Sequence, residues 1–252
     1  MFTKAIVRRP GPEFSRGITT ARLGQPDHEL ALEQHGRYCE ALEDCGLELT
    51  ILEPDSAYPD CPFVEDTAVV TEQVAVIARP GADRRRGEEC AVEEVLSAHR
   101  PIERIEPPGT LDGGDVLQVG KRFFIGLSAR TNFEGVRQLG SILDRHGYSI
   151  TAVPVGKLLH LKSGINHAGG NALAVTKNLA PLDVLSGFDL VQVPNEEAYA
   201  ANCLFVNGRL LVAAGFLRAL TAFRELGREM IELEMSEFRK MDGGLTCLSI
   251  RF

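Results

Sequence analysis

The chain has 252 residues, of which 44% are hydrophobic and 25% charged, a composition typical of a soluble globular protein. Its formal net charge of −8 argues against a nucleic-acid partner, because such surfaces bind phosphates through cations. No apolar run approaches the roughly 20 residues that cross a bilayer, so we expect no membrane-spanning segment.

The cysteines and the first residues indicate the cellular compartment. None of the six cysteines has CxxC spacing, which predicts neither a zinc site nor a disulfide framework. The residues that follow Met1 lack the length and cleavage pattern of a signal peptide. We therefore expect a cytoplasmic protein with reduced thiols and no bound metal.

The chain begins with a strand, a long loop, a helix and a second strand. Residues 2–7 predict the first strand, and residues 47–52 predict the second. Residues 8–26 are rich in Gly, Pro, Arg and Thr, which predicts a long loop, and loops of this length are often functional. Apolar residues near helical spacing predict a helix over residues 26–45 that stops at Gly46.

Three β-hairpins follow at a nearly regular interval. Their turns lie at residues 72–73, 120–121 and 207–208, which are 48 and then 87 residues apart. The second gap is about twice 44 residues, so it leaves room for a further unit around residues 172–175. A period of about 45 to 50 residues is the size of a repeat in propeller proteins.

Helical segments and short strands separate the hairpins, so that about five hairpin–helix–strand units fit the chain. This pattern predicts one domain, residues 1–252, of radially repeated α/β units. A doubly wound parallel sheet is the alternative, but it needs helical crossovers where the sequence predicts tight hairpins. The predicted helices span residues 87–99, 132–146 and 216–230, and the strands after them span residues 102–105, 149–153 and 231–233.

The last twelve residues, 241–252, carry a glycine pair and then an alternating pattern. The alternation predicts a strand with Leu248 and Ile250 on one face and Cys247 and Ser249 on the more polar face. A buried and inert cysteine is the alternative, because free cysteines usually behave as small hydrophobes.

Two acidic segments directly precede predicted hairpins. Residues 59–66 contain three carboxylates, and residues 111–116 place Asp112 beside a pair of glycines. A solvated loop or a bare turn explains either segment alone. At equivalent places in a propeller, however, the two segments would converge at one end, where their natural ligand is a cation.

A histidine and an arginine complete the set of candidate residues. His160 lies on the opposite face of a predicted strand from its two leucine neighbours, although a structural histidine is the alternative. Arg130 lies where a helix begins. A Cys–His pair is the apparatus of thiolate catalysis, while carboxylates bind guanidinium groups and arginines bind carboxylates. The set predicts a substrate that is cationic at one end and anionic at the other, such as an arginine-like amino acid.

Six short segments, in order along nearly the whole chain, together resemble the dimethylarginine dimethylaminohydrolase family of the guanidine-modifying pentein superfamily. This resemblance implies an α/β fold, a five-bladed propeller of ββαβ units, which agrees with the repeat described above. The segments are residues 63–66, 111–116, 126–132, 160–163, 200–203 and 245–247.

The resemblance implies a hydrolase that converts asymmetric dimethylarginine and monomethylarginine to citrulline plus dimethylamine or methylamine, without a cofactor. Cys247 would attack the guanidinium carbon to form a covalent thiouronium intermediate. His160 would protonate the departing amine and then activate water, and Asp66 and Asp112 would grip the guanidinium. Members of the family occur as monomers and as homodimers, and the small-molecule substrate is the expected partner.

The resemblance also implies how the amino-acid end is bound. The α-carboxylate would pair with two arginines, and the α-amine would contact an acidic residue and a backbone carbonyl, with further side chains alongside. Residues 16–25 correspond to the family's mobile lid, in which Leu23 would be a closing residue. The other implied substrate-binding residues are Arg85, Arg130, Asp60, Met241, Glu65 and Phe63.

Residues 164–167 depart from the animal members of the family, which leaves the choice of guanidine open. Two alternatives remain at this point. One is another pentein hydrolase that acts on free arginine or citrulline. The other is a non-catalytic propeller that binds amino acids, although such a module has no use for the thiol of Cys247.

Overall fold

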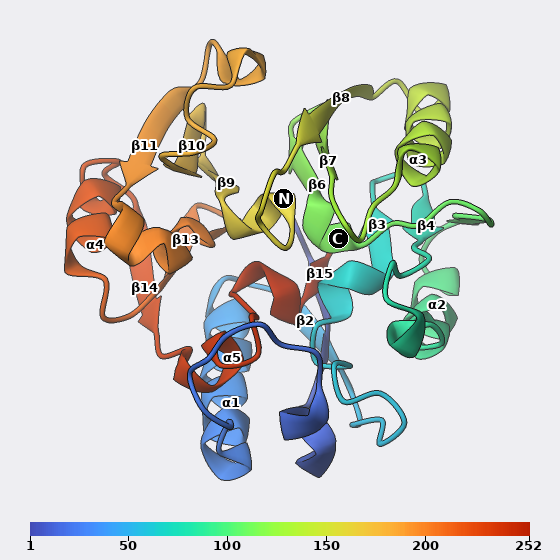
Figure 1. Ribbon diagram of the computed structural model, residues 1–252, viewed down its shortest axis with the longest axis horizontal. Helices are drawn as coiled ribbons and strands as arrows, with labels where there is room; N and C mark the ends of the chain where they lie inside the picture. The colour runs from blue at the N-terminus through green and yellow to red at the C-terminus, as the bar shows by residue number, and fades with distance from the viewer.

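The computed structural model describes all 252 residues and contains five three-stranded sheets arranged around a central axis (Figure 1). In every sheet the middle strand pairs antiparallel with one neighbour and parallel with the other. The antiparallel pair is a hairpin in four sheets, and a parallel pair requires a longer connection. The architecture is a five-bladed α/β propeller, as predicted.

Four blades are built from consecutive strands, and all three predicted hairpins are confirmed. The unit expected around residues 172–175 is the hairpin of the third of these blades. The strands are β3 (Ala68–Val70), β4 (Ala75–Ile77) and β5 (Ile102–Arg104); β6 (Val116–Val119), β7 (Arg122–Leu127) and β8 (Ser149–Pro154); β9 (Ile165–Gly169), β10 (Ala172–Thr176) and β11 (Asp189–Val193); and β12 (Leu204–Val206), β13 (Arg209–Ala213) and β14 (Glu229–Leu233).

The fifth blade joins the two ends of the chain. Its middle strand β1 (Lys4–Arg8) pairs in parallel with β2 (Glu48–Leu52) and antiparallel with the short C-terminal strand β15 (Ile250–Arg251). Both termini therefore lie near the middle of the ring in Figure 1. This pairing places the C-terminal segment, which carries Cys247, next to the axis.

Helices cover the outside of the ring (Figure 1). The helix α1 (His28–Asp44) connects β1 to β2, while α2 (Glu89–Ser97), α3 (Phe133–Arg145) and α4 (Leu217–Arg224) connect the second and third strands of their blades, and the short α5 (Ser236–Arg239) follows β14. The blade of β9–β11 has only a 3₁₀ turn, Asp183–Leu185, in the corresponding place. No helix has the length and apolar character that a bilayer-spanning segment needs.

The predicted helix over residues 216–230 is wrong in its second half. The helix α4 ends at Arg224, and Gly227 follows with a φ of 65°, a left-handed conformation that suits glycine. Glu229 and Met230 then pair in parallel with β13 as part of β14. The sheet pairing overrides the local helical pattern.

The predicted strands around Cys247 and His160 are also wrong. Thr246–Leu248 form a 3₁₀ turn, and only the last two residues before Phe252 form a strand. The Asn202 side chain accepts a hydrogen bond from the backbone N–H of Thr246 at 3.0 Å and so holds this turn. His160 likewise precedes a 3₁₀ turn, Leu161–Ser163, instead of lying in a strand. Both side chains are therefore presented by turns.

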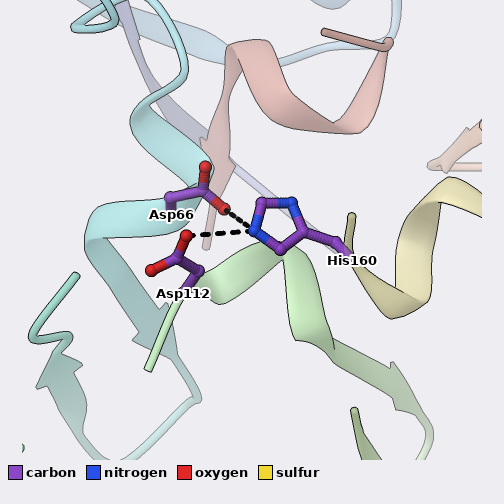
Figure 2. Close-up of side chains that lie close together, drawn as sticks. All are labelled: Asp66, Asp112 and His160. Atoms are coloured by element: carbon purple, nitrogen blue, oxygen red, sulfur yellow. Dashed lines mark hydrogen bonds and ion pairs between the residues drawn. The ribbon is translucent and has the colours of Figure 1, made fainter. Parts of the chain in front are cut away.

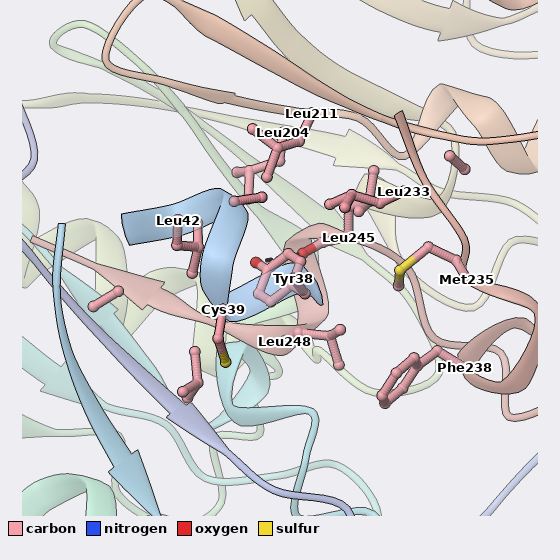
Figure 3. Close-up of a cluster of buried hydrophobic side chains, with 14 of the residues drawn as sticks. Tyr38, Cys39, Leu42, Leu204, Leu211, Leu233, Met235, Phe238, Leu245 and Leu248 are labelled. Carbon is pink, nitrogen blue, oxygen red and sulfur yellow. Dashed lines mark hydrogen bonds between the residues drawn. The ribbon is translucent and has the colours of Figure 1, made fainter. Parts of the chain in front are cut away.

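The largest hydrophobic cluster anchors the turn of Cys247 (Figure 3). Tyr38 of α1 is fully buried, and its hydroxyl donates to the carbonyl of Leu245 at 2.8 Å and lies 2.6 Å from the Ser249 hydroxyl. Each fully buried apolar side chain contributes about 1.5 to 3 kcal/mol to the stability of such a cluster. The labelled members in Figure 3 include Leu42, Leu204, Leu211, Leu233, Phe238 and Leu248.

Candidate active site

Turns from three blades bring Asp66, Asp112 and His160 together (Figure 2). Asp66 lies in the 3₁₀ turn Val64–Thr67 before β3, and Asp112 directly precedes another before β6. His160 Nε2 lies 3.0 Å from Asp112 Oδ2 and 4.0 Å from Asp66 Oδ1. All three side chains are buried.

The two carboxylates hold a proton on His160. Burial opposes the charged imidazole, but the charge of Asp66 and the hydrogen bond to Asp112 outweigh it and raise the pKa of His160 to about 9. Burial also opposes the Asp66 carboxylate, yet His160 and Arg85 hold the pKa of Asp66 well below its usual range. At neutral pH His160 is therefore an imidazolium, which can act as a general acid.

The same three residues are close enough to ligate a metal, since one donor atom of each lies within 4.8 Å of the others. A protonated imidazole has no lone pair for a metal, however. The carboxylate of Asp66 already accepts hydrogen bonds from Arg85 and from the Gly114 backbone. The cluster is therefore better suited to proton transfer than to metal binding.

Two arginines lie next to these carboxylates, the buried Arg85 and the half-buried Arg130, and they differ in how fully they are paired. Arg85 donates to Asp66 Oδ2 at 2.5 Å, to Glu88 and to the Phe63 carbonyl. Arg130 Nη1 lies 3.7 Å from Asp112 Oδ2 but makes no hydrogen bond although it is buried. Arg130 therefore keeps an unused donor at the site.

The half-buried thiol of Cys247 lies in the Thr246–Leu248 turn, where the Gly244 N–H donates to Sγ at 3.4 Å. Burial, with smaller contributions from the charges of Glu65 and Asp66, raises the pKa of Cys247 to about 12. The thiol is therefore protonated at neutral pH in this arrangement of charges. A bound cation would favour the thiolate, which is the nucleophilic form.

Most of the candidate residues line one pocket, which we call the carboxylate pocket. Eight of them are among its lining residues, and Asp112 is hydrogen-bonded to one of these, His160. The pocket has a volume of about 30 Å³. Its lining consists of Ile18, Asp60, Phe63, Asp66, Arg85, Arg130, Leu159, His160, Met241, Asp242, Gly243 and Cys247.

Four lining residues were not predicted as site residues, namely Ile18, Leu159, Asp242 and Gly243. Two of them, Ile18 and Asp242, form hydrogen bonds that involve the segment of residues 16–25. The backbone N–H of Ile18 donates to both carboxylate oxygens of Asp60, at 3.0 and 3.1 Å. Asp242 has a φ of 58°, unusual for a residue other than glycine, and its carboxylate accepts hydrogen bonds from Thr19 and Thr20. The glycine pair after Asp242 was the signal that could have indicated it.

The structure does not bring Leu23 or Glu65 to the lining of this pocket. Leu23 is 48% exposed. Glu65 is buried against a separate cavity of about 160 Å³, where it contacts Lys162 at 2.6 Å, Thr246 at 2.7 Å and Arg251 at 3.1 Å. We call these four residues the Glu65 cluster.

A second small pocket, which we call the glycine pocket, adjoins the carboxylate pocket. Its volume is about 50 Å³, and the two pockets share His160, Asp242, Gly243 and Cys247. The reacting pair therefore borders both spaces. The remaining lining residues of the glycine pocket are Gly114, Lys162, Ser163, Tyr199, Asn202 and Gly244.

A thiol beside an imidazolium and two carboxylates, presented by the turns of a five-bladed α/β propeller, defines a cysteine hydrolase of the pentein class. Over 254 residues the chain is 44% identical to the N(G),N(G)-dimethylarginine dimethylaminohydrolase of Pseudomonas aeruginosa, with all of both chains covered. No family model matches the chain. The chain belongs to the dimethylarginine dimethylaminohydrolase family.

Solved structures of dimethylarginine dimethylaminohydrolases have the same fold. A cysteine-to-serine mutant of the Pseudomonas aeruginosa enzyme, complexed with citrulline, matches with a TM-score of 0.98 at 43% identity over all of both chains. A histidine-to-glycine mutant, an adduct with S-methyl-L-thiocitrulline, matches equally well, with a TM-score of 0.98 at 43% identity over all of both chains.

Proposed function

We propose that this chain hydrolyses N-methylated arginines to citrulline and dimethylamine or methylamine. The observation that carries the proposal is that one pocket contains a thiol, an imidazolium, carboxylates and two arginines. Two similar structures support it, because a mutant of the Pseudomonas aeruginosa enzyme is complexed with citrulline and a mutant dimethylarginine dimethylaminohydrolase is an adduct with S-methyl-L-thiocitrulline.

In this proposal the substrate guanidinium enters the carboxylate pocket beside Asp66 and Asp112. The two carboxylates localise its delocalised charge, which makes the central carbon a better electrophile. Burying a carboxylate costs several kcal/mol unless a cation accompanies it, and in the structure the His160 imidazolium and Arg85 supply that charge. The arriving cation also favours ionisation of Cys247, whose pKa is otherwise raised.

The chemistry then has two halves. The Cys247 thiolate attacks the guanidinium carbon, and His160 gives its proton to the departing amine, which leaves an S-alkylthiouronium on the cysteine. The neutral imidazole next takes a proton from water as the water attacks the same carbon. Collapse of this second adduct releases citrulline and regenerates the thiolate, so the reaction needs no cofactor.

The amino-acid end of the substrate would lie at the other side of the carboxylate pocket. Arg130, with its unused donor, binds the α-carboxylate in this proposal, and Arg85 assists from its bonds to Asp66. Asp60 and the Met241 carbonyl bind the α-amine. In the structure the Asp60 carboxylate accepts a hydrogen bond from the Ile18 backbone N–H instead.

The other three proposed substrate-binding residues, Leu23, Phe63 and Glu65, lie farther from the reacting groups or outside the pocket. Leu23 would contribute only when the segment of residues 16–25 moves, since it is exposed in the structure. Phe63 packs beside the pocket, and Glu65 would act from behind the thiol through the cluster described above.

We further propose that residues 1–252 act as one cytoplasmic domain. The pairing of β1 with β15 supports a single unit, and the six free cysteines fit a reducing compartment. We propose that the protein acts as a monomer or a homodimer, as members of its family do.

A competition assay tests the proposed function. The purified protein is incubated with equal amounts of asymmetric dimethylarginine, monomethylarginine, arginine and citrulline, and products are followed by mass spectrometry. We expect dimethylamine and citrulline in equal amounts while arginine persists. Ammonia from arginine, or ornithine from citrulline, would instead indicate another pentein hydrolase, and no product at all would indicate a binding protein.

A further inference from the structure

We propose that Asp115 is a positioning residue of the active site, where its buried carboxylate holds the turn of His160 and the loop of Arg130 in place. The inference rests on the proposed function and extends it to a residue that lines none of the three pockets described above. The observations that carry it are two hydrogen bonds of Asp115, the further bonds of its partner Ser128, and the burial of a carboxylate that forms no ion pair.

The first hydrogen bond of Asp115 joins two blades. Asp115 ends the 3₁₀ turn Gly113–Asp115 before β6, and its Oδ1 accepts from the Leu161 backbone N–H at 2.8 Å. Leu161 directly follows His160, at the start of the next blade. Because a peptide unit is planar, fixing the N–H of Leu161 also fixes the plane that contains the His160 Cα. Asp115 therefore helps to set the 3.0 Å distance from His160 Nε2 to Asp112 Oδ2.

The second hydrogen bond reaches the loop that follows β7. The Ser128 hydroxyl donates to Asp115 Oδ2 at 2.6 Å. Its oxygen also accepts from the backbone N–H groups of Arg130 and Thr131, at 3.0 and 3.1 Å. The Thr131 hydroxyl in turn accepts from the Asp112 backbone N–H at 3.1 Å. One carboxylate is thereby connected to three residues of the proposed site, namely His160, Arg130 and Asp112.

The space around Asp115 is shaped for these bonds. A Cβ on Gly126 would lie only 2.6 Å from Asp115 Oδ1, the oxygen that accepts from Leu161. A side chain at position 126 would therefore push the carboxylate away from the turn of His160. The glycine at the end of β7 leaves the room that the bond between the two blades needs.

The charge of Asp115 is balanced through His160. Asp115 is fully buried and forms no ion pair, and a buried carboxylate is costly unless a cation or hydrogen bonds compensate it. Burial raises the pKa of Asp115, and the charge of His160 is the largest effect that opposes this rise. For His160, burial lowers the pKa, while Asp66, Asp112 and, to a smaller extent, Asp115 raise it. The charged forms of His160 and Asp115 therefore stabilise each other.

This mutual effect distinguishes Asp115 from a carboxylate that only holds a turn together. Asp66 and Asp112 also face His160, and Arg85 and Arg130 lie beside those two carboxylates. Removal of the Asp115 charge should therefore weaken the hold of His160 on its proton as well as loosen its turn. A purely structural carboxylate would not alter the acid strength of His160.

Two variants separate the two hydrogen bonds. Asp115→Asn keeps the shape of the side chain and an oxygen for the Leu161 N–H, but it removes the charge. Ser128→Ala keeps the charge and removes the bond to the loop of Arg130. The matched control is Glu237→Gln in α5, where a buried carboxylate also accepts from a backbone N–H, that of Asp27, at 2.6 Å.

The pKa of His160 is measured by NMR on protein labelled at histidine Cε1, with the signal assigned by its loss in His160→Gln. Values of kcat and KM are measured with asymmetric dimethylarginine. We expect Asp115→Asn to lower the pKa of His160 by at least about half a unit. It should also lower kcat at least about tenfold, with a smaller change in KM, because proton transfer by a positioned acid supplies a large part of the rate.

Ser128→Ala should instead raise KM at least about threefold, the effect of one lost hydrogen bond, and leave the pKa of His160 unchanged. Glu237→Gln should leave that pKa unchanged as well. An unaltered His160 titration or an unaltered kcat in Asp115→Asn would overturn the positioning role. If that variant does not fold, Ser128→Ala decides, and an unaltered KM there would overturn the proposal.

The titration needs no substrate, so it separates this proposal from the proposed function. A lowered pKa of His160 in Asp115→Asn, together with a wild type that releases no citrulline from dimethylarginine, would overturn the proposed function and retain the link between Asp115 and His160.

Discussion

The two sides of Cys247 carry similar charged residues but differ in how these are paired. On one side, in the Glu65 cluster, the carboxylate of Glu65 is bound by Lys162, Arg251 and Thr246. On the other side, Arg130 has a buried nitrogen without a hydrogen bond. A cluster whose charges are all paired holds the fold together, whereas unused bonding capacity marks the side that receives a substrate.

The paired side also supports the catalytic turns. Glu65 directly precedes Asp66, Thr246 directly precedes Cys247, and Lys162 lies two residues after His160. The contacts among these neighbours therefore connect three turns from different blades. Removing one charge of a buried pair leaves the other uncompensated, which typically costs 3 to 5 kcal/mol.

The largest effect should come from the nucleophile itself. We expect Cys247→Ser to abolish citrulline formation, because a serine hydroxyl is a far weaker nucleophile than a thiolate, while citrulline still binds. Product formation is measured by mass spectrometry and binding by calorimetry. The matched control is Cys90→Ser, at an exposed cysteine of α2, and full turnover by the Cys247 variant would reject the assignment.

A change on the paired side should act mainly on stability. Glu65→Ala leaves Lys162 and Arg251 without their buried partner, and we expect it to lower the free energy of unfolding by about 3 to 5 kcal/mol. Urea denaturation measures this change. The exposed pair of Lys4 and Glu48 gives the control, since Glu48→Ala should barely alter the midpoint. A Glu65→Ala variant as stable as the wild type would contradict the proposed difference between the Glu65 cluster and the Arg130 side of Cys247.

A change on the unpaired side should act mainly on binding. Arg130→Ala is expected to weaken substrate binding by about 2 to 5 kcal/mol, because the bound carboxylate loses its partner. Titration calorimetry with citrulline measures this loss. Its control is Arg37→Ala at the surface of α1, and unchanged affinity for citrulline in the Arg130 variant would place that residue outside the site.

The most gradual effect concerns the dependence of stability on pH. The pKa of His160 is raised in the folded protein to about 9 from its usual value of 6.5, so the stability it contributes is complete below about pH 6.5 and is lost as pH rises to about 9. By linkage this amounts to roughly 3 kcal/mol. We expect the difference in free energy of unfolding between the wild type and His160→Gln, measured by denaturation across this range, to become smaller as pH rises. A difference that stays constant with pH would contradict the ion pair of His160 with Asp66 and Asp112.

The sequence predicted the blades better than the turns between them. Hairpin patterns such as that around Asn207 and Gly208 are local, so the repeat was readable without the structure. The 3₁₀ turn of Cys247 could not be predicted from the sequence, because a hydrogen bond to Asn202, 45 positions earlier in the chain, holds it. The end of α4 was also missed, since pairing of β14 with β13 decides it.

The same distinction applies to the site. The motif residues Cys247, His160 and Asp66 were identified from the sequence, and the structure brings them to one pocket. The place of Glu65 could not be predicted, because adjacent residues of a 3₁₀ turn point in different directions and only the neighbouring blades determine which space each one enters. Asp242 was missed because its contacts with Thr19 and Thr20 join distant parts of the chain.

The most direct test of the central claim is to trap the covalent intermediate. The protein is mixed with asymmetric dimethylarginine, quenched in acid within milliseconds, digested and analysed by mass spectrometry. We predict that the peptide containing Cys247 gains the mass of an S-alkylthiouronium, while the peptides of the other five cysteines are unchanged. Citrulline formation without any adduct on Cys247, or an adduct on another cysteine, would contradict the account.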